Sequence, residues 1–321
     1  MSNHEKKEAV SLSLSIVVPL LNEEASLREL FEHIVTAVSG KHDYEVIFVD
    51  DGSEDRSWDE IQKLKKEFDV VKGIRFRRNY GKSIALQKGF EVARGKYIAT
   101  MDADLQDDPN EIPLMIDQLE KEGYDLVSGW KKKRNDPLSK KLPSRFFNFF
   151  TSLTTRIKLH DFNCGLKVYR REVTEKLTLY GELHRYIPFL AYQQGFTRIG
   201  EKVVLHHARK HGESKFGFTR FIKGFLDLFT LLFLSSYMQR PMHFFGTLGT
   251  VFLSIGGVIT VYLAFMRIFY QEYLGNRPLL LFGVLLLVLG VQFFSLGLLG
   301  EMLNKGSSLR DIDRINIKDR V

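Results

Sequence analysis

The sequence contains a single cysteine, Cys164, among its 321 residues. One cysteine cannot form a disulfide within the chain, and its scarcity fits a domain that stays in a reducing compartment. Residues 1–10 are charged and contain no apolar core, and the apolar run at 16–21 is too short for a signal peptide or a membrane span. We therefore expect the N-terminal domain to remain on the side where it is synthesised.

Two stretches near the C-terminus lack charge. Residues 242–266 and 278–300 contain no Asp, Glu, Lys or Arg, and each is long enough to cross a hydrocarbon core, which needs about 20 apolar residues. We predict two transmembrane helices within residues 241–303, at about 242–266 and 279–300. The alternative is a pair of buried core helices, but uninterrupted apolar runs of this length favour membrane spans.

The connector between the two predicted spans, residues 267–277, is short, so the spans should form a hairpin with both chain termini on one side. Basic residues flank the pair, although Arg267 and Arg277 lie in the connector. They are Lys215, Arg220, Lys223 and Arg240 before it, and Lys305, Arg310, Arg314, Lys318 and Arg320 after it. The positive-inside rule then predicts that both termini, including the tail 304–321, are cytoplasmic.

Residues 216–240 combine Phe and Leu with Arg220, Lys223 and Asp227, as expected of an amphipathic helix in the membrane interface. A core helix of the soluble domain is the alternative.

The net charge of +7 is compatible with nucleic acid, an anionic membrane or an anionic substrate, and composition does not choose between them. The positions of the charges beside the apolar runs favour a lipid bilayer, and we expect no nucleic-acid partner.

The N-terminal part alternates β-rich runs with amphipathic stretches, which predicts βαβ units in an α/β, Rossmann-like, mostly parallel sheet. The predicted strands are 14–19, 44–50, 70–75, 97–102 and 125–129, and the predicted helices are 24–38, 57–67, 82–93 and 110–122. Ligands of such sheets bind at the carboxyl ends of the strands. These ends are polar here, at 19–23, 50–53, 79–81 and 102–104.

Asp102 and Asp104 directly follow an apolar strand. Two carboxylates in this arrangement can share one hard divalent cation, which neutralises a pyrophosphate and eases its departure. An Asp-x-Asp triplet alone is common in solvated turns. The preceding strand, Gln106 and the whole stretch DADLQDDP at 102–109 make the pattern specific.

Two other stretches resemble known binding motifs but lack residues that those motifs require. Gly81-Lys82-Ser83 resembles the end of a phosphate-binding P-loop, but Phe76 stands where that loop requires glycine. Lys82 is better assigned to the edge that binds a sugar nucleotide. A zinc site is also disfavoured, because the candidate histidines have no nearby cysteine and lie among cationic residues. These histidines are His206, His207 and His211, beside Arg209 and Lys210.

Taken together, the motifs resemble those of the family 2 glycosyltransferases with the GT-A fold, and within them the dolichyl- or polyprenyl-phosphate sugar transferases. The matching stretches are VPLLNE (18–23), VDDGS (49–53), RNYGK (78–82), DADLQDDP (102–109), DFNCG (161–165) and GESKF (212–216). The resemblance covers nearly the whole chain, including the apolar hairpin. It is strongest to bacterial undecaprenyl-phosphate transferases that modify lipopolysaccharide or O-antigen, which implies the bacterial inner membrane.

The resemblance implies roles for individual residues of the strand-end edge. It implies that Pro19, Glu23 and Asp51 contact the nucleoside. It also implies that Asp102, Asp104 and Gln106 hold Mg²⁺ or Mn²⁺ against the diphosphate, so that Asp102 serves the nucleotide-sugar as well, beside Lys82. Asp51 offers an acceptor to a base N–H group. Asp50 and Asp51 also fit a turn that caps a helix, and both readings can hold together.

Asp104 and Asp161 are the predicted catalytic residues. An inverting transferase usually needs a general base for a hydroxyl acceptor, and Asp161 lies in a polar loop suited to that role. A phosphate monoester, however, has a second pKa near 6 and is already largely ionised at neutral pH. Asp161 is therefore expected either to act as a base or to orient the acceptor or the sugar.

The acceptor phosphate needs fixed cations, for which we predict Arg134, Arg209 and Lys215. Arg134 ends a basic run, 131–134, followed by Pro137 and Pro143, which indicates a mobile loop and a candidate lid. Within this run we expect Lys131, Lys132 and Lys133 to form a solvated basic surface.

We thus expect residues 1–215 to form a cytoplasmic catalytic domain. The resemblance implies that it moves one sugar from a nucleotide-sugar to polyprenyl phosphate for cell-envelope glycans, with UDP expected over GDP. A processive polysaccharide synthase is the nearest rival, but it carries a Gln-x-x-Arg-Trp motif, and neither Trp58 nor Trp130 follows an Arg. A non-catalytic membrane scaffold is the second rival. Assembly of several copies of the chain is left open.

Overall fold

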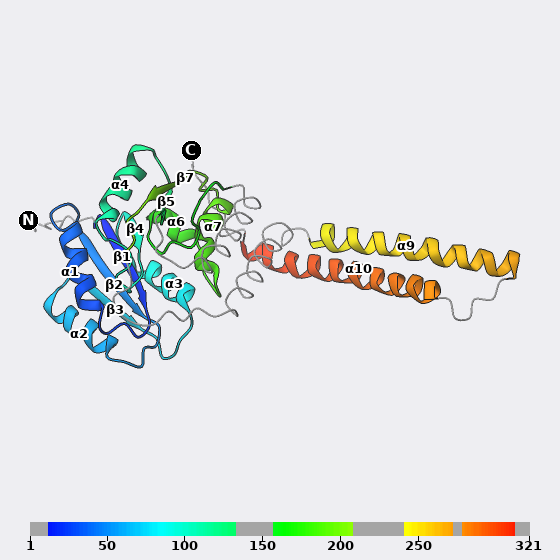
Figure 1. Ribbon diagram of the computed structural model, residues 1–321, viewed down its shortest axis with the longest axis horizontal. Helices are drawn as coiled ribbons and strands as arrows, with labels where there is room; N and C mark the ends of the chain where they lie inside the picture. Colours follow the sequence, from blue (N-terminus) through cyan, green and yellow to red (C-terminus); the bar gives the residue numbers. More distant parts are fainter. Residues whose placement is uncertain (1–11, 133–156, 208–240, 272–277, 312–321) are drawn as a thin grey trace, which may run out of the picture. The chain divides into compact units, whose positions relative to one another are not determined.

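The structure is a computed structural model that describes residues 12–132, 157–207, 241–271 and 278–311. The chain divides into two compact units, Met1–Asp227 and Leu228–Val321, which are described separately. The first unit contains an α/β sheet, and the second contains two long helices (Figure 1).

The first unit is built on a seven-stranded sheet with the order β3-β2-β1-β4-β6-β5-β7 (Figure 1). Its first four strands in the chain are all parallel, as the βαβ pattern predicts. They are β1 (Leu14–Leu20), β2 (Tyr44–Asp50), β3 (Val71–Arg75) and β4 (Tyr97–Thr100). Each lies within two residues of its predicted range, and the prediction of a mostly parallel Rossmann-like sheet is confirmed.

Helices cover both faces of this sheet because each contributes an apolar side to one of two core clusters. One face carries α1 (Leu27–Val38), α2 (Ser57–Glu67) and α4 (Glu111–Lys121). The other carries α3 (Lys82–Val92), α6 (Arg171–Lys176) and α7 (Ile187–Gln193), the last preceded by the 3₁₀ turn η1 (Leu183–Tyr186). The sheet is therefore held between two helical layers, which leaves the strand ends as the open edge.

The expectation of five consecutive strands in one sheet was incomplete, because two further strands complete it. The strand β6 (Lys167–Arg170) lies antiparallel between β4 and β5 (Leu126–Trp130), and β7 (Ile199–Val203) pairs in parallel with β5. Since β6 is antiparallel, it begins where β4 ends, with Lys167 opposite Thr100. The polar loop that precedes β6 is thereby brought to the end of β4.

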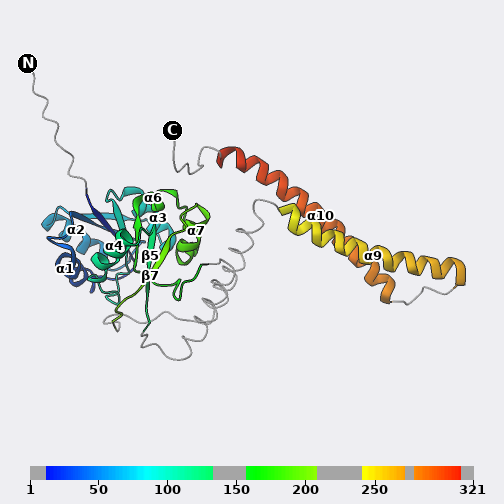
Figure 2. The same cartoon turned by 90° about the horizontal axis from the view of Figure 1, so that it is seen from above.

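The second unit is a pair of antiparallel helices, α9 (Pro241–Tyr270) and α10 (Pro278–Asp311), which lie side by side in Figures 1 and 2. Glycines allow their close approach. A Cβ added at Gly249 would lie 2.8 Å from the Gly290 carbonyl oxygen, and one added at Gly256 would lie 2.9 Å from that of Gly283. Such small residues let helix backbones pack closely, as they do in membrane helix pairs.

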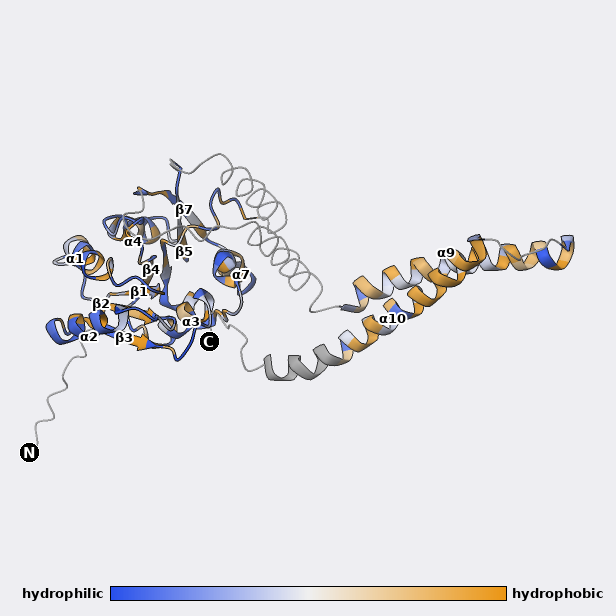
Figure 3. Cartoon of the chain, turned by 60° about the horizontal axis from the view of Figure 1, so that its bottom comes forward, coloured by the Kyte–Doolittle hydropathy of each residue, from blue (hydrophilic) through white to orange (hydrophobic). Residues whose placement is uncertain are grey.

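Both helices are long and apolar enough to cross a membrane, over Pro241–Tyr270 and Pro278–Met302 (Figure 3). The predicted spans 242–266 and 279–300 fall inside these limits. Much of their apolar surface is exposed within the unit; Val258 is 70% exposed and Leu281 is 75% exposed. This exposure disfavours the alternative of two buried core helices, because a core helix hides its apolar side chains.

Candidate active site

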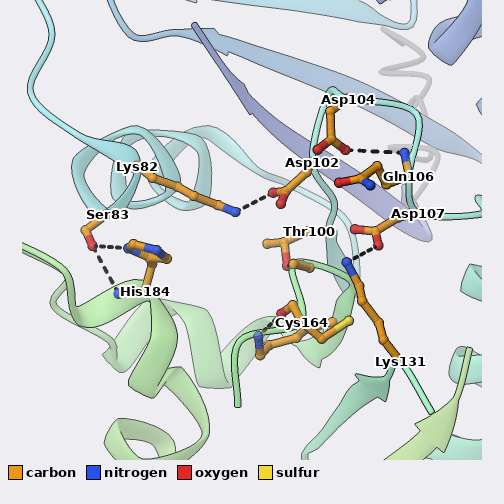
Figure 4. Close-up of polar contacts among 12 residues, drawn as sticks. Lys82, Ser83, Thr100, Asp102, Asp104, Gln106, Asp107, Lys131, Cys164 and His184 are labelled. Atoms are coloured by element: carbon orange, nitrogen blue, oxygen red, sulfur yellow. Dashed lines mark hydrogen bonds and ion pairs between the residues drawn. The ribbon is translucent and has the colours of Figure 1, made fainter. Parts of the chain in front are cut away.

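Asp102 lies just beyond β4 and faces the start of α3 (Figure 4). Its carboxylate forms an ion pair with the ammonium group of Lys82, the first residue of α3. The backbone of Gly165 lies against the same carboxylate, since a Cβ added there would lie 2.8 Å from both Asp102 oxygens. The Thr100 hydroxyl donates to the Gly165 carbonyl oxygen at 2.9 Å and fastens this loop to β4. The structure thus brings Lys82, Asp102 and Gly165 together.

Asp104 and Gln106 follow on a loop whose residues alternate between buried and partly exposed. Asp102, Asp104 and Gln106 are partly exposed, whereas Ala103 and Leu105 are buried. The Gln106 backbone N–H donates to Asp104 Oδ1 at 3.3 Å. The alternation places the three predicted cation ligands on the accessible side of the loop and anchors the loop through its apolar residues.

The donor set of this loop fits a hard divalent cation. It offers two carboxylates and the carboxamide oxygen of Gln106, which are oxygen ligands of the kind that Mg²⁺ and Mn²⁺ prefer. Within the described part of the chain, no group of three or more His, Cys, Asp or Glu side chains is arranged to enclose a metal. A cation held here would therefore take its remaining ligands from water and a bound diphosphate, as Mg²⁺ commonly does.

Asp161 lies in the loop before β6 and is almost fully buried, with 2% of its surface exposed. Its backbone N–H donates to Glu201 Oε1 at 3.0 Å, and its Oδ1 accepts from the Asn163 N–H at 3.1 Å. These contacts fix its orientation. They suit a carboxylate that orients neighbouring groups.

Lys167 is a site residue that the sequence analysis missed. It begins β6, is buried, and donates from its ammonium group to the Cys164 carbonyl oxygen. Burial lowers the pKa of Lys167, while the negative charges of Asp161 and Asp102 act in the opposite direction. Lys167 therefore holds the loop before β6 through its bond to the Cys164 carbonyl oxygen. The sequence signal for Lys167 is weak: it is a lysine at the start of the short strand KVYR.

A cavity of about 750 Å³ opens beside the ends of β1, β2 and β3. Its lining includes Asn22, Ser53 and three arginines, Arg75, Arg77 and Arg78. Gly52, which also lines it, has φ +80°, and a Cβ there would lie 2.5 Å from the Arg78 backbone. The cavity is large and basic enough for an anionic nucleotide.

Asp51 connects this cavity to the start of α3. Its two carboxylate oxygens accept hydrogen bonds from the backbone N–H groups of Tyr80 and Gly81, at 2.7 and 2.9 Å. Burial raises the pKa of Asp51, although these two N–H groups favour its charged form. The carboxylate therefore holds the loop after β3 in place, and each oxygen keeps a lone pair for a further donor. Asp50 forms the predicted turn, since its Oδ1 accepts from the Ser53 N–H at 2.8 Å.

The other two residues predicted to contact the nucleoside lie at the end of β1 and just after it. Pro19 is buried in β1. The pairing of β1 with β4 ends at Val17, so the missing N–H group of Pro19 costs no hydrogen bond to β4. Glu23 is partly exposed; its N–H donates to the Ser57 hydroxyl at 2.9 Å, and its carboxylate accepts from the Ser26 hydroxyl at 3.1 Å. Both residues lie at the same strand-end edge as Asp51.

The expectation of a solvated surface for the basic run is wrong for Lys131. Its ammonium group lies 2.8 Å from Asp107 Oδ1, and only 12% of its side chain is exposed (Figure 4). Burial acts to lower the pKa of Lys131, but the interactions with neighbouring acidic groups, Asp107 foremost, together raise it above the ordinary value. Lys132 is exposed, as expected, and its ammonium group lies 5.3 Å from the ring centre of Trp130. Lys133 lies outside the described residues.

The three residues predicted to bind an acceptor phosphate, Arg134, Arg209 and Lys215, also lie outside the described residues. The same holds for His211, for the predicted interfacial helix 216–240 and for most of the tail 304–321. His206, which is within the described part, faces Asp107 at 3.8 Å. The assignments of the residues outside the described ranges stay predictions.

The sequence matches the family described as glycosyl transferase family 2 over residues 15–178. That segment holds the predicted nucleotide edge, the Asp102–Asp104 pair and Asp161. The chain belongs to the family 2 glycosyltransferases. As a member of this family, it is an enzyme that transfers a sugar.

Relatives of this glycosyltransferase match it over most of their length. It is 43% identical to the dodecaprenyl-phosphate galacturonate synthase of Rhizobium johnstonii, over 91% of this chain and 88% of the relative. It is 37% identical to the undecaprenyl-phosphate 4-deoxy-4-formamido-L-arabinose transferase of Shewanella sediminis, over 95% and 92% of the two chains. Both relatives are named as sugar transferases that act on polyprenyl phosphates.

Among solved structures, the glycosyltransferase resembles glucosyl-3-phosphoglycerate synthase from Mycobacterium tuberculosis. The crystal structure of that protein with Mn²⁺ and UDP-glucose gives a TM-score of 0.54 at 19% identity, over 70% of this chain and 79% of that one. At this identity the likeness shows the fold, which confirms the GT-A prediction.

Proposed function

We propose that this glycosyltransferase moves a single sugar from a nucleotide-sugar to a polyprenyl phosphate at a membrane surface. The observation that carries the proposal is the extent of the match to two named polyprenyl-phosphate sugar transferases. At most 9% of the chain lies outside these matches. That part of the chain is shorter than α9, which has 30 residues, so it cannot contain the whole hairpin. The similarity therefore reaches the hairpin as well as the catalytic domain, which fits a lipid-linked substrate.

In the proposed reaction, a phosphate oxygen of the acceptor forms a bond to the anomeric carbon of the sugar. The bond from that carbon to the diphosphate oxygen breaks, and the nucleoside diphosphate leaves with the electron pair, which inverts the configuration at the anomeric carbon. A divalent cation, Mg²⁺ or Mn²⁺, held by Asp102, Asp104 and Gln106 would neutralise charge on the leaving diphosphate. Pro19, Glu23, Asp51 and Lys82 bind the nucleotide-sugar from the strand-end edge.

The acceptor nucleophile in this reaction is already ionised at neutral pH, since the second pKa of a phosphate monoester is near 6. It needs orientation more than proton removal. The buried and hydrogen-bonded Asp161 fits an orienting role, and Arg134, Arg209 and Lys215 are proposed to hold the phosphate.

Incubation of the purified full-length protein with a panel of nucleotide-sugars and undecaprenyl phosphate tests this function. We expect one donor to yield a monoglycosylated lipid and free nucleoside diphosphate in equal amounts. Undecaprenol, which lacks the phosphate, is the matched control and should give no product. A growing polymer would identify a processive synthase, and donor binding without transfer to any acceptor would support a scaffold.

We further propose that α9 and α10 span a membrane as a hairpin, most simply the bacterial inner membrane, with the catalytic domain and both termini cytoplasmic. The support is the charge-free stretch within each helix, 242–266 and 278–300, with basic residues on both flanks of the pair. A reporter fused after Val321 should then behave as a cytoplasmic protein in intact cells. A periplasmic signal from that reporter would contradict the topology without affecting the proposed reaction.

A further inference from the structure

The loop that carries the predicted cation ligands has an unfavourable backbone at its centre. Leu105, between Asp104 and Gln106, has φ +59°, in the left-handed region that a leucine rarely adopts. Its side chain is buried, with 6% exposed. Backbone of this kind persists only where the surrounding structure imposes it. The loop must therefore be held by contacts outside itself.

One contact of this kind is the ion pair between Asp107 and Lys131. Lys131 directly follows β5, and its ammonium group lies 2.8 Å from Asp107 Oδ1 (Figure 4). The Asp107 side chain is fully buried, so it has no open path to a substrate. A buried ion pair requires a closely defined geometry, unlike an apolar contact, because only close contact between the two charges offsets the cost of their desolvation.

Backbone contacts with the segment after β7 also hold this loop. Asp107 and His206 form an antiparallel β-bridge, and the His207 N–H donates to the Gln106 carbonyl oxygen at 2.8 Å. His206 Nδ1 lies 3.8 Å from Asp107 Oδ1, on the carboxylate already paired with Lys131. The segment after β7 and the end of β5 therefore converge on Asp107, one residue beyond the last predicted ligand.

We propose that Lys131 is a positioning residue of the cation site: its buried ion pair with Asp107 fixes the backbone from Asp102 to Asp107, so that Asp102, Asp104 and Gln106 face one bound cation. Lys131 and Asp107 act through the loop and contact neither substrate nor cation. This assignment rests on the cation site of the proposed function, but not on the identity of the donor or acceptor.

Lys131→Met tests the proposal, because it removes the charge and keeps most of the side-chain length. We expect the Mn²⁺ dissociation constant of the full-length protein, measured by electron paramagnetic resonance, to rise about 10- to 100-fold, as is typical when a residue supporting metal ligands is removed. Hydrogen exchange should quicken at the backbone amides of residues 102–107 and 206–207. Lys131→Arg keeps the charge and should stay within a few-fold of the parent in Mn²⁺ affinity.

Lys72→Met is the matched control for lost stability. Lys72 forms an ion pair with the buried Glu45 and lies on β3, in another part of the sheet. Its replacement should lower thermal stability but leave Mn²⁺ affinity and exchange at residues 102–107 unchanged. Equal loss of Mn²⁺ affinity in both variants would reduce Lys131 to a general structural residue and overturn the proposal.

A double variant, Asp107→Leu with Lys131→Met, leaves no unpaired buried charge and guards against simple misfolding. It should recover thermal stability relative to Lys131→Met while its Mn²⁺ affinity stays weakened. Parent-like Mn²⁺ affinity in the double variant, or no Mn²⁺ binding by the parent, would also overturn the proposal. None of these measurements uses a sugar donor or a lipid, so failure of the proposed transfer reaction remains distinguishable.

Discussion

Asp104→Asn should lower turnover by on the order of 10²- to 10³-fold while the protein remains folded. The substitution keeps the shape of the side chain but removes the negative charge with which the loop is proposed to hold a cation against the leaving diphosphate. Loss of metal assistance to a leaving group costs several kcal/mol of transition-state stabilisation, and each 1.36 kcal/mol is about tenfold in rate. Turnover measured at saturating donor and acceptor, with Mg²⁺ and Mn²⁺ in turn, checks this expectation.

Asp117→Asn provides the matched control for the Asp104 variant. Asp117 lies on α4, and its side chain is 60% exposed and 3.8 Å from Lys121. The same chemical change there should leave turnover within about twofold of the parent, since exposed ion pairs contribute little. If Asp104→Asn also turned over like the parent, Asp104 would not be a cation ligand.

Gly165→Ala should reduce turnover by about 10²-fold with little change in thermal stability. The added Cβ would lie 2.8 Å from the Asp102 carboxylate, and the hydrogen bond from Thr100 prevents the Gly165 backbone from moving away. The Asp102 side chain is partly exposed and can turn aside, so the fold is preserved while the carboxylate is displaced. A misplacement of about 1 Å in a catalytic geometry can cost about 10²-fold.

Gly73→Ala separates the effect of crowding from the effect on the site. A Cβ at Gly73, in β3, would lie 2.7 Å from the Ile61 side chain within the packing between β3 and α2. This variant should lose thermal stability and keep near-parent turnover once folded, which is the opposite of the result expected for Gly165→Ala. Matching losses of stability in the two variants, with activity retained in both, would show that the position of Asp102 does not limit the reaction.

Much of the fold was predictable because its signals are local. The four parallel strands β1 to β4 and the helices between them follow from apolar periodicity within short windows of sequence. The strands β6 and β7 were missed for the same reason. Each is short and contains charged residues, KVYR and IGEKV, and becomes a strand only by pairing with β5 and its neighbours.

The sequence by itself determined the sheet of βαβ units, the polar strand ends with Asp102 and Asp104, and two apolar stretches long enough to become spanning helices, since composition and periodicity specify these locally. Only the tertiary structure decided what surrounds the carboxylates. The antiparallel β6 brings Gly165 and Lys167 to Asp102, and the end of β5 brings Lys131 to Asp107. A lysine in a basic run is expected in solvent, and its burial became favourable only because a distant part of the chain supplied the opposite charge.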